Sequence, residues 1–71
     1  MDTPIGNEVY NLLSILDNKL EALAAYDKYK GDMHDETKKM LEQIRQDDYR
    51  HAQMLANALE MMARDGGWTK K

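Results

Sequence analysis

The sequence contains no cysteine. Disulfides, thiolate metal sites, iron–sulfur clusters and thiol catalysis are therefore excluded. A chain of 71 residues forms at most one domain, residues 1–71, and a hydrophobic core of this size is marginal without a disulfide, a metal or oligomerisation. Because disulfides are excluded, a bound metal and self-association are the remaining means of stabilising the fold.

Other scarce features exclude further classes of protein. No apolar run approaches the roughly 18 residues of a membrane span, and the first residues lack the basic and then apolar pattern of a signal peptide. Lys and Arg are dispersed along a chain of net charge −3, which argues against a nucleic-acid surface. The only proline is at position 4, and no strand-like alternation is present. We therefore expect a cytoplasmic, all-α protein that binds neither membranes nor nucleic acids.

A first apolar stripe predicts a helix over about residues 4–30. Thr3 is suited to cap this helix, with Pro4 at its first position, and Asn7 is the alternative cap. We expect Gly31 to end the helix in the left-handed conformation. The apolar residues recur every three or four positions, which is the helical period: Val9, Leu12, Leu13, Leu16, Leu20 and Leu23.

A second stripe predicts a helix over about residues 33–64. Asp32 or Asp35 is expected to cap its start, and Gly66–Gly67 to stop it. Residues 65–71 then form a tail without regular structure. The seam of this helix consists of Thr37, Met40, Leu41, Ile44, Asp48, His51, Leu55, Ala58, Leu59 and Met62.

The connection between the two helices is short, which makes them antiparallel neighbours. Both apolar stripes are wider than one seam, because Ile15 and Ala22 widen the first, and Met54 and Met61 widen the second. One partner helix cannot cover such an arc, whereas a second hairpin can. We therefore predict an antiparallel two-helix hairpin that dimerises into a four-helix bundle.

Two ionisable residues, Asp48 and His51, interrupt the second seam. They are three positions apart, so both side chains can reach a common point. An ionisable pair in a core is costly unless it is paired or binds a metal, and a carboxylate with an imidazole suits iron, manganese or zinc. The alternative is a metal-free polar layer that fixes the register of the bundle. In a twofold dimer, either arrangement would occur twice across the axis.

These segments resemble the ferritin-like superfamily, and within it the short encapsulated ferritins. Residues 20–22, Leu-Glu-Ala, followed by Tyr26 and Asp27, resemble that family's Leu-Glu-Ala followed by Trp-Tyr. Residues 47–54 resemble its acidic Glu-x-x-His-Ala-x-Met segment. The resemblance covers roughly residues 12–64. It implies a two-helix subunit that forms a four-helix bundle, and a di-iron site, only on dimerisation.

The resemblance also implies a function and a set of metal ligands. Asp48 and His51 stand at the family's ligand positions, and Glu21 and Asp27 are further candidates. The implied activity is ferroxidase-like, the oxidation of iron for storage or detoxification. The implied partners are a second copy of the chain and, in the encapsulated type, a shell protein.

Two departures from the family pattern weigh against this function. The family's second-helix carboxylate is usually Glu, and Asp48 reaches about one methylene less far. The family also takes a Glu ligand seven residues before its Tyr, and here that position is Lys19. The ammonium of this lysine would repel a metal ion, or would pair with Asp48 and so replace the metal. Tyr26 either supports a metal ligand or lies at the edge of the apolar face. The alternative function is therefore a metal-free structural or interaction module with a core layer of Lys19, Asp48 and His51.

Overall fold

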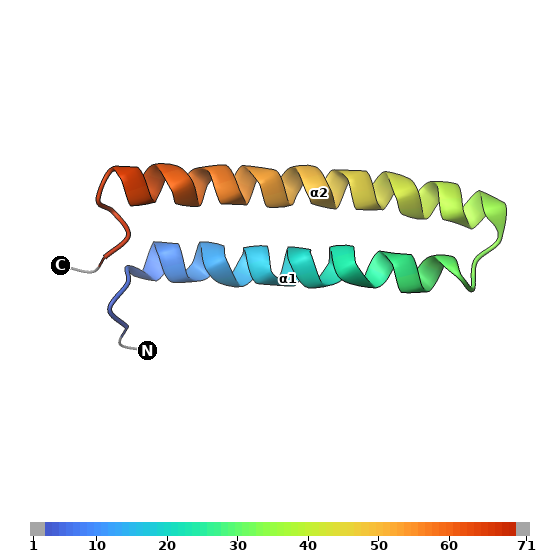
Figure 1. Cartoon of the computed structure of the whole chain (residues 1–71), viewed down its shortest axis with the longest axis horizontal. Helices are drawn as coiled ribbons and strands as arrows, with labels where there is room; N and C mark the ends of the chain where they lie inside the picture. The colour runs from blue at the N-terminus through green and yellow to red at the C-terminus, as the bar shows by residue number, and fades with distance from the viewer. Residues whose placement is uncertain (1–2, 70–71) are drawn as a thin grey trace.

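The structure is a computed structural model that describes residues 3–69, and it contains two α-helices (Figure 1). Helix α1 spans Asn7–Lys30 and helix α2 spans Asp35–Arg64. The helices lie side by side and antiparallel, joined by residues 31–34 at one end, while both termini lie at the other end. The predicted all-α helical hairpin is therefore confirmed. Within the described residues, neither helix is long and apolar enough to cross a membrane.

Helix α1 begins at residue 7, later than the predicted position 4, and its cap is Gly6. Thr3 does not cap the helix, because its hydroxyl donates to the carbonyl of Ile5 at 2.8 Å. The preceding segment is instead extended along the tail. Ile5 forms an antiparallel bridge with Thr69, and the N–H of Gly6 donates to the carbonyl of Trp68 at 3.2 Å. This pairing of the two ends excludes a helical conformation at position 4.

The connection also differs from its predicted form. Gly31 has φ −61°, which is the right-handed region, so the predicted left-handed cap is wrong. The N–H groups of Asp32 and Met33 donate to carbonyls three residues earlier, at 3.2 and 3.3 Å, which continues the right-handed turn. Helix α2 is capped by His34 and has no side-chain cap bond, so neither predicted aspartate caps it. Asp35 is in the first turn, where the helix dipole favours negative charge.

The left-handed glycine is at the end of α2. Gly66 has φ 76°, and the N–H of Gly67 donates to the carbonyl of Met62 at 2.8 Å. This arrangement is typical of a helix C-terminus, where a left-handed residue allows carbonyls of the last turn to be satisfied. The predicted stop at Gly66–Gly67 is therefore confirmed, and α2 ends at Arg64 as expected.

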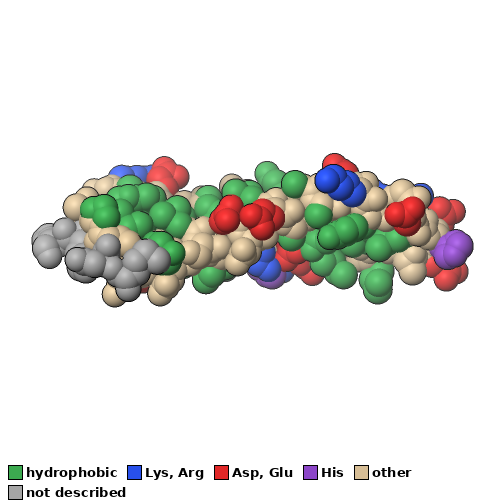
Figure 2. Space-filling model, turned by 90° about the horizontal axis from the view of Figure 1, so that it is seen from below, with side chains coloured by type: hydrophobic (Ala, Val, Ile, Leu, Met, Phe, Trp, Pro, Cys, Tyr) green, Lys and Arg blue, Asp and Glu red, His purple; other side chains and the backbone are tan. Residues whose placement is uncertain are grey.

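The hairpin buries little of its apolar surface. Its Cα atoms extend over 51 × 22 × 12 Å. The shortest dimension is the thickness of a single layer of helices. Figure 2, which views the molecule from the side of α1, shows hydrophobic side chains at several places on the surface. Among the described residues, the buried apolar side chains are Val9, Leu41, Ala52 and Leu59, and of these Val9 is fully buried. The exposed large apolar side chains are Tyr10, Ile15, Leu20, Tyr29, Met40, Ile44, Tyr49, Met54 and Met61.

Candidate functional site

A cluster of polar side chains between the helices is centred on Asp48, in the middle of α2. Its side chain is 15% exposed. The ammonium of Lys19 donates to Oδ1 at 2.9 Å, and the hydroxyl of Tyr26 donates to Oδ2. Nδ1 of His51 lies 3.9 Å from Oδ1. We call these four side chains the polar layer, and each oxygen of its central carboxylate accepts a hydrogen bond from α1.

The spacing of the residues along each helix explains this geometry. Lys19 and Tyr26 are seven positions apart on α1, which is about two turns and places both on one face. Asp48 of the antiparallel helix lies between them, so one side chain approaches each carboxylate oxygen. His51 is one turn further along α2 on the same side. Its side chain is 45% exposed, so the layer extends from the helix interface to the surface of the hairpin.

The contacts in the layer shift two pKa values in opposite directions. The hydrogen bond from Tyr26, followed by the hydrogen bond and charge of Lys19, holds the pKa of Asp48 below its usual range. The same hydrogen bond raises the pKa of Tyr26, and burial adds to this effect. The layer therefore favours an ionised carboxylate beside a neutral phenol. The side chain of Lys19 is 33% exposed, so water screens the ion pair and its net contribution to stability is modest.

We expect the layer to make the fold sensitive to acid. Because the pKa of Asp48 is lower in the folded chain than the unfolded value of about 3.9, the unfolded state binds more protons in acid. This contribution is present above about pH 4 and is lost as the pH falls through the folded pKa. Urea unfolding followed by circular dichroism between pH 7 and pH 2 should show this loss, and Asp48→Asn should flatten the profile. An unchanged profile in the variant would contradict this role.

A second carboxylate with a lowered pKa lies on the surface. Nε of Arg45 donates to the two carboxylate oxygens of Glu42 at 3.1 and 3.0 Å, and these bonds lower the pKa of Glu42 to about 2. Both side chains are about one-third exposed. Glu42 and Arg45 are one helical turn apart and form a surface ion pair. The further contact of Glu42 is with Lys30, which is not a member of the polar layer. Glu42→Gln therefore removes a second acid-sensitive carboxylate outside the layer, and comparing its profile with that of Asp48→Asn separates the two contributions.

The other two predicted ligands do not join the layer. The side chain of Asp27 is 82% exposed, and its Oδ1 lies 3.5 Å from the ammonium of Lys30. Glu21 is exposed on α1. Within residues 3–69, no three His, Asp or Glu side chains come close enough together to hold a metal ion. Of the predicted ligands, the structure thus brings together Asp48 and His51 alone.

The residues of one chain do not fit the di-iron group that the resemblance implies. Each oxygen of Asp48 already accepts a hydrogen bond, one from Lys19 and one from Tyr26. A cation at this carboxylate would share its oxygens with these donors and would stand next to an ammonium group, which repels it. The hydrogen bond of Tyr26 to Asp48 was not predicted from the sequence. Its signal is the seven-residue spacing from Lys19, which places both side chains on one face of α1.

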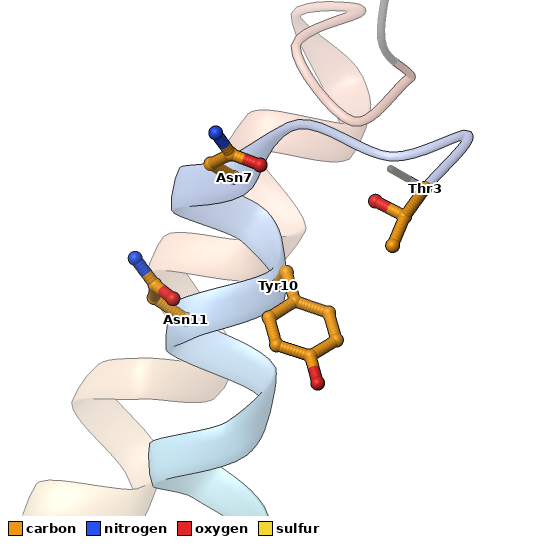
Figure 3. Close-up of a pocket in the computed structure, with 4 residues that line it drawn as sticks. All are labelled: Thr3, Asn7, Tyr10 and Asn11. Carbon is orange, nitrogen blue, oxygen red and sulfur yellow. The ribbon is translucent and has the colours of Figure 1, made fainter. Parts of the chain in front are cut away.

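A polar hollow at the start of α1 is a second candidate (Figure 3). It is lined by Thr3, Asn7, Tyr10 and Asn11. Asn7 and Asn11 lie one turn apart on α1, and the side chain of Tyr10 points away from them. No carboxylate, imidazole or amine lines this hollow, so its lining offers no acid–base pair and no charged metal ligand.

An apolar groove runs between the helices at their middle. It is lined by Leu16, Leu20 and Leu23 of α1 and by Tyr49, Ala52, Gln53 and Ala56 of α2. Its lining has no ionisable side chain other than the phenol of Tyr49. The groove can contact another apolar surface but offers no chemistry of its own.

Comparison of the chain with protein-family models, with curated proteins and with solved structures finds no match.

Proposed function

We propose that this chain is a metal-free interaction module, in which two hairpins assemble face to face into a four-helix bundle with the polar layer in its core. The observation that carries this proposal is the exposed area. The accessible surface is 5577 Å², against about 4,500 Å² for a compact monomer of 8.2 kDa. The excess of about 1,000 Å² is similar to the roughly 800 Å² that each partner contributes to a standard protein interface.

The single layer of helices supports the same proposal. Stable domains are built from at least two packed layers around one core, and this hairpin has one layer, 12 Å thick across its Cα atoms. A second hairpin on the open face would supply the missing layer without any new fold. Association of this kind also stabilises each subunit, because folding and dimerisation are coupled by mass action.

The polar layer has a role in such a bundle that does not require a metal. Asp48 is paired with Lys19 and Tyr26 within the chain, so its burial by a second hairpin leaves no uncompensated charge. A polar group in an otherwise apolar seam disfavours shifted pairings, because a shift brings it against apolar side chains. The layer therefore contributes to the specificity of assembly more than to its free energy.

A second candidate function is the iron binding, with a ferroxidase-like activity, that the resemblance implies. It is favoured by the 3.9 Å separation of Asp48 and His51, and by the partial exposure of His51 on the open side of the hairpin. A second copy would bring a second carboxylate and imidazole to that side. The ion pair of Lys19 with Asp48 weighs against it, so it ranks second.

One experiment tests both functions. The protein is incubated anaerobically with Fe(II) and passed through gel filtration, after which its mass is measured by sedimentation equilibrium and its metal by mass spectrometry. We expect twice the 8.2 kDa chain mass and no stoichiometric iron. A monomer would overturn the interaction module. Iron at half to one ion per chain, lost in Asp48→Ala/His51→Ala, would establish the second function instead.

A matched variant makes the iron result specific. Lys19→Glu replaces the ammonium by a carboxylate at the position where the resembled family has a ligand. If the lysine excludes the metal, the variant should retain iron where the wild type retains none. Iron retained equally by the wild type and by the variant would mean that Lys19 does not exclude it.

A further inference from the structure

We propose that the interface of the dimer is formed by α2 lying antiparallel against α2 of a second copy, in one register. This inference rests on the proposed function and specifies its partner and its contact surface. The surface is a stripe along α2 that we call the outer stripe. It consists of Met40, Ile44, Asp47, His51, Met54, Ala58 and Met61.

The outer stripe has the spacing of a coiled-coil seam. Its members follow one another at alternating intervals of four and three residues, which is the heptad pattern of helices that pack along their length. Most of its members immediately precede, in sequence, a residue of the seam that packs on α1. The two stripes are therefore neighbouring but separate faces of α2. The seam against α1 contains the buried and half-buried residues Leu41, Asp48, Ala52, Leu55, Leu59 and Met62.

The outer stripe has no partner within the described hairpin. Met40 is 60% exposed, Met54 is 63% exposed and Met61 is 59% exposed, although all three are large apolar residues. Ile44 is 43% exposed. A row of exposed apolar side chains at this spacing is typical of an interaction surface. The polar members lie near the middle of α2, so the stripe has apolar ends and a polar centre.

This distribution selects one antiparallel register with a second copy. When Asp47 lies opposite His51 of the second copy, the twofold axis produces the same acid–imidazole pair twice. The next layer outward on either side then pairs Ile44 with Met54, and the one beyond it pairs Met40 with Ala58. Apolar side chains thus meet apolar ones, with the large Met40 against the small Ala58, and polar side chains meet polar ones.

Registers shifted by one heptad lose this agreement. A shift in one direction places His51 opposite Met54 and Asp47 opposite Ala58 of the second copy. A shift in the other direction places His51 opposite Met40 and Asp47 opposite Ile44. Each shift buries a polar side chain against an apolar one, which is unfavourable.

The charges at the ends of α2 agree with the antiparallel direction. The first turn of α2 is acidic, with Asp35 and Glu36, and the last turn contains Arg64. In the selected register, the last turn of one copy lies beside the first turn of the other, so opposite charges are close. In the proposed dimer, Arg50 lies near the twofold axis and therefore approaches Arg50 of the second copy. It is 67% exposed and lies 3.5 Å from Asp47, so solvent and the carboxylate screen this repulsion.

Helix α1 presents a corresponding stripe on the same side of the hairpin. Lys19 and Tyr26 belong to this stripe, and both contact Asp48. Because His51 also lies beside Asp48, the stripe of α1 is on the side of the hairpin that bears His51. The twofold axis that pairs α2 with its copy places this stripe against its own copy as well. It contains Leu12, Ile15, Lys19, Ala22, Tyr26 and Tyr29, again at intervals of three and four residues.

The absence of cysteine allows the register to be tested by disulfide formation. Ile44→Cys/Met54→Cys places two thiols that face each other across the selected interface. Within one chain they are ten residues apart, or about 15 Å along the helix, which exceeds the roughly 7 Å limit for a disulfide. Both positions are exposed in the hairpin, so the substitutions leave its own packing intact. The matched control is Gln46→Cys/Ala56→Cys, with the same spacing on the other side of α2.

The variants are oxidised at low micromolar concentration and analysed on a non-reducing gel, beside sedimentation of the wild type. We expect most Ile44→Cys/Met54→Cys chains to form covalent dimers, at least tenfold more than in the control or in either single-cysteine variant. Equal cross-linking in the control would overturn this inference. So would a wild-type dimer in which the 44/54 pair does not cross-link, although self-association would then stand. A monomeric wild type would overturn both proposals.

Discussion

Ile44→Asp is expected to dissociate the dimer, raising its dissociation constant by at least about 100-fold. In the selected register, Ile44 packs against Met54 of the second copy, and the twofold axis repeats this contact. An unpaired carboxylate buried at such a contact costs several kcal/mol or leaves the interface hydrated and open. Each loss of about 1.4 kcal/mol is a tenfold change in affinity, and the dimer contains two such sites, so the expected effect is large.

The control for this prediction is Tyr49→Asp. Tyr49 is 59% exposed, lies on the same helix and lines the apolar groove, so the variant makes an equal change of character away from the outer stripe. Sedimentation velocity over a range of concentrations gives the dissociation constants. A dimer that survives Ile44→Asp and dissociates in Tyr49→Asp would place the interface at the groove.

The thermal stability of Ile44→Asp follows from the same coupling. A dimer gains stability with concentration, because the second chain binds the folded state and not the unfolded state. The Tm of the wild type should therefore rise with concentration, whereas that of the variant should be lower and independent of it. Ile44 is 43% exposed in the hairpin, so its direct contribution to hairpin packing is limited. Circular dichroism at several concentrations separates this loss of coupling from a local packing defect.

The helical hairpin could be predicted because each helix repeats one local signal many times. Apolar residues at intervals of three and four extend over almost the full length of α1 and α2, and no local feature contradicts them. The start of α1 could not be predicted in the same way. Thr3 and Pro4 are good local signals for a helix start, but Ile5 pairs with Thr69 at the far end of the sequence. A contact between residues so distant in sequence leaves no trace in local propensity.

The connection shows a similar limit. The sequence predicts a left-handed cap at Gly31, but the left-handed glycine is Gly66, where the sequence predicts only the end of a helix. At Gly31 the chain continues in a right-handed turn for two further residues before it reverses. The two glycines have the same local chemistry, and they differ in the path that the chain must take to the next element.

The polar layer was partly accessible from the sequence, because Asp48 and His51 interrupt an apolar seam and Lys19 has the same position on the facing helix. Which donor meets which oxygen depends on the axial offset of the two helices, and this offset has no local signal. The sequence therefore leaves two roles open for Tyr26, and in the structure its hydroxyl donates to Asp48. Asp27 was predicted as a metal ligand, but it lies near the end of α1 and outside the polar layer. Its Oδ1 is 3.5 Å from the ammonium of Lys30.

Asp48→Ala should lower the free energy of unfolding by about 1–3 kcal/mol, because it removes the acceptor of two hydrogen bonds and leaves Lys19 and Tyr26 without a partner. For a chain of this size, a loss of about 1 kcal/mol lowers the Tm by roughly 4–8 °C. The triple variant Lys19→Met/Tyr26→Phe/Asp48→Leu should instead be as stable as the wild type or more stable. Replacing the ion pair and its hydrogen-bonded phenol together by apolar residues of similar volume removes the desolvation penalty together with the attraction.

Thermal and urea unfolding of both variants, at one chain concentration, decide what the layer does for the protein. A stable triple variant beside a destabilised Asp48→Ala means that the layer is retained for a reason other than stability. In the proposed bundle, that reason is the choice of partner face and register, to which Lys19 and Tyr26 contribute from the stripe of α1 beside the Asp47–His51 pair of α2. The triple variant should then form mixed species in sedimentation velocity, because more than one pairing becomes accessible to its apolar face. A triple variant as unstable as Asp48→Ala would show that Lys19, Tyr26 and Asp48 contribute net free energy to folding.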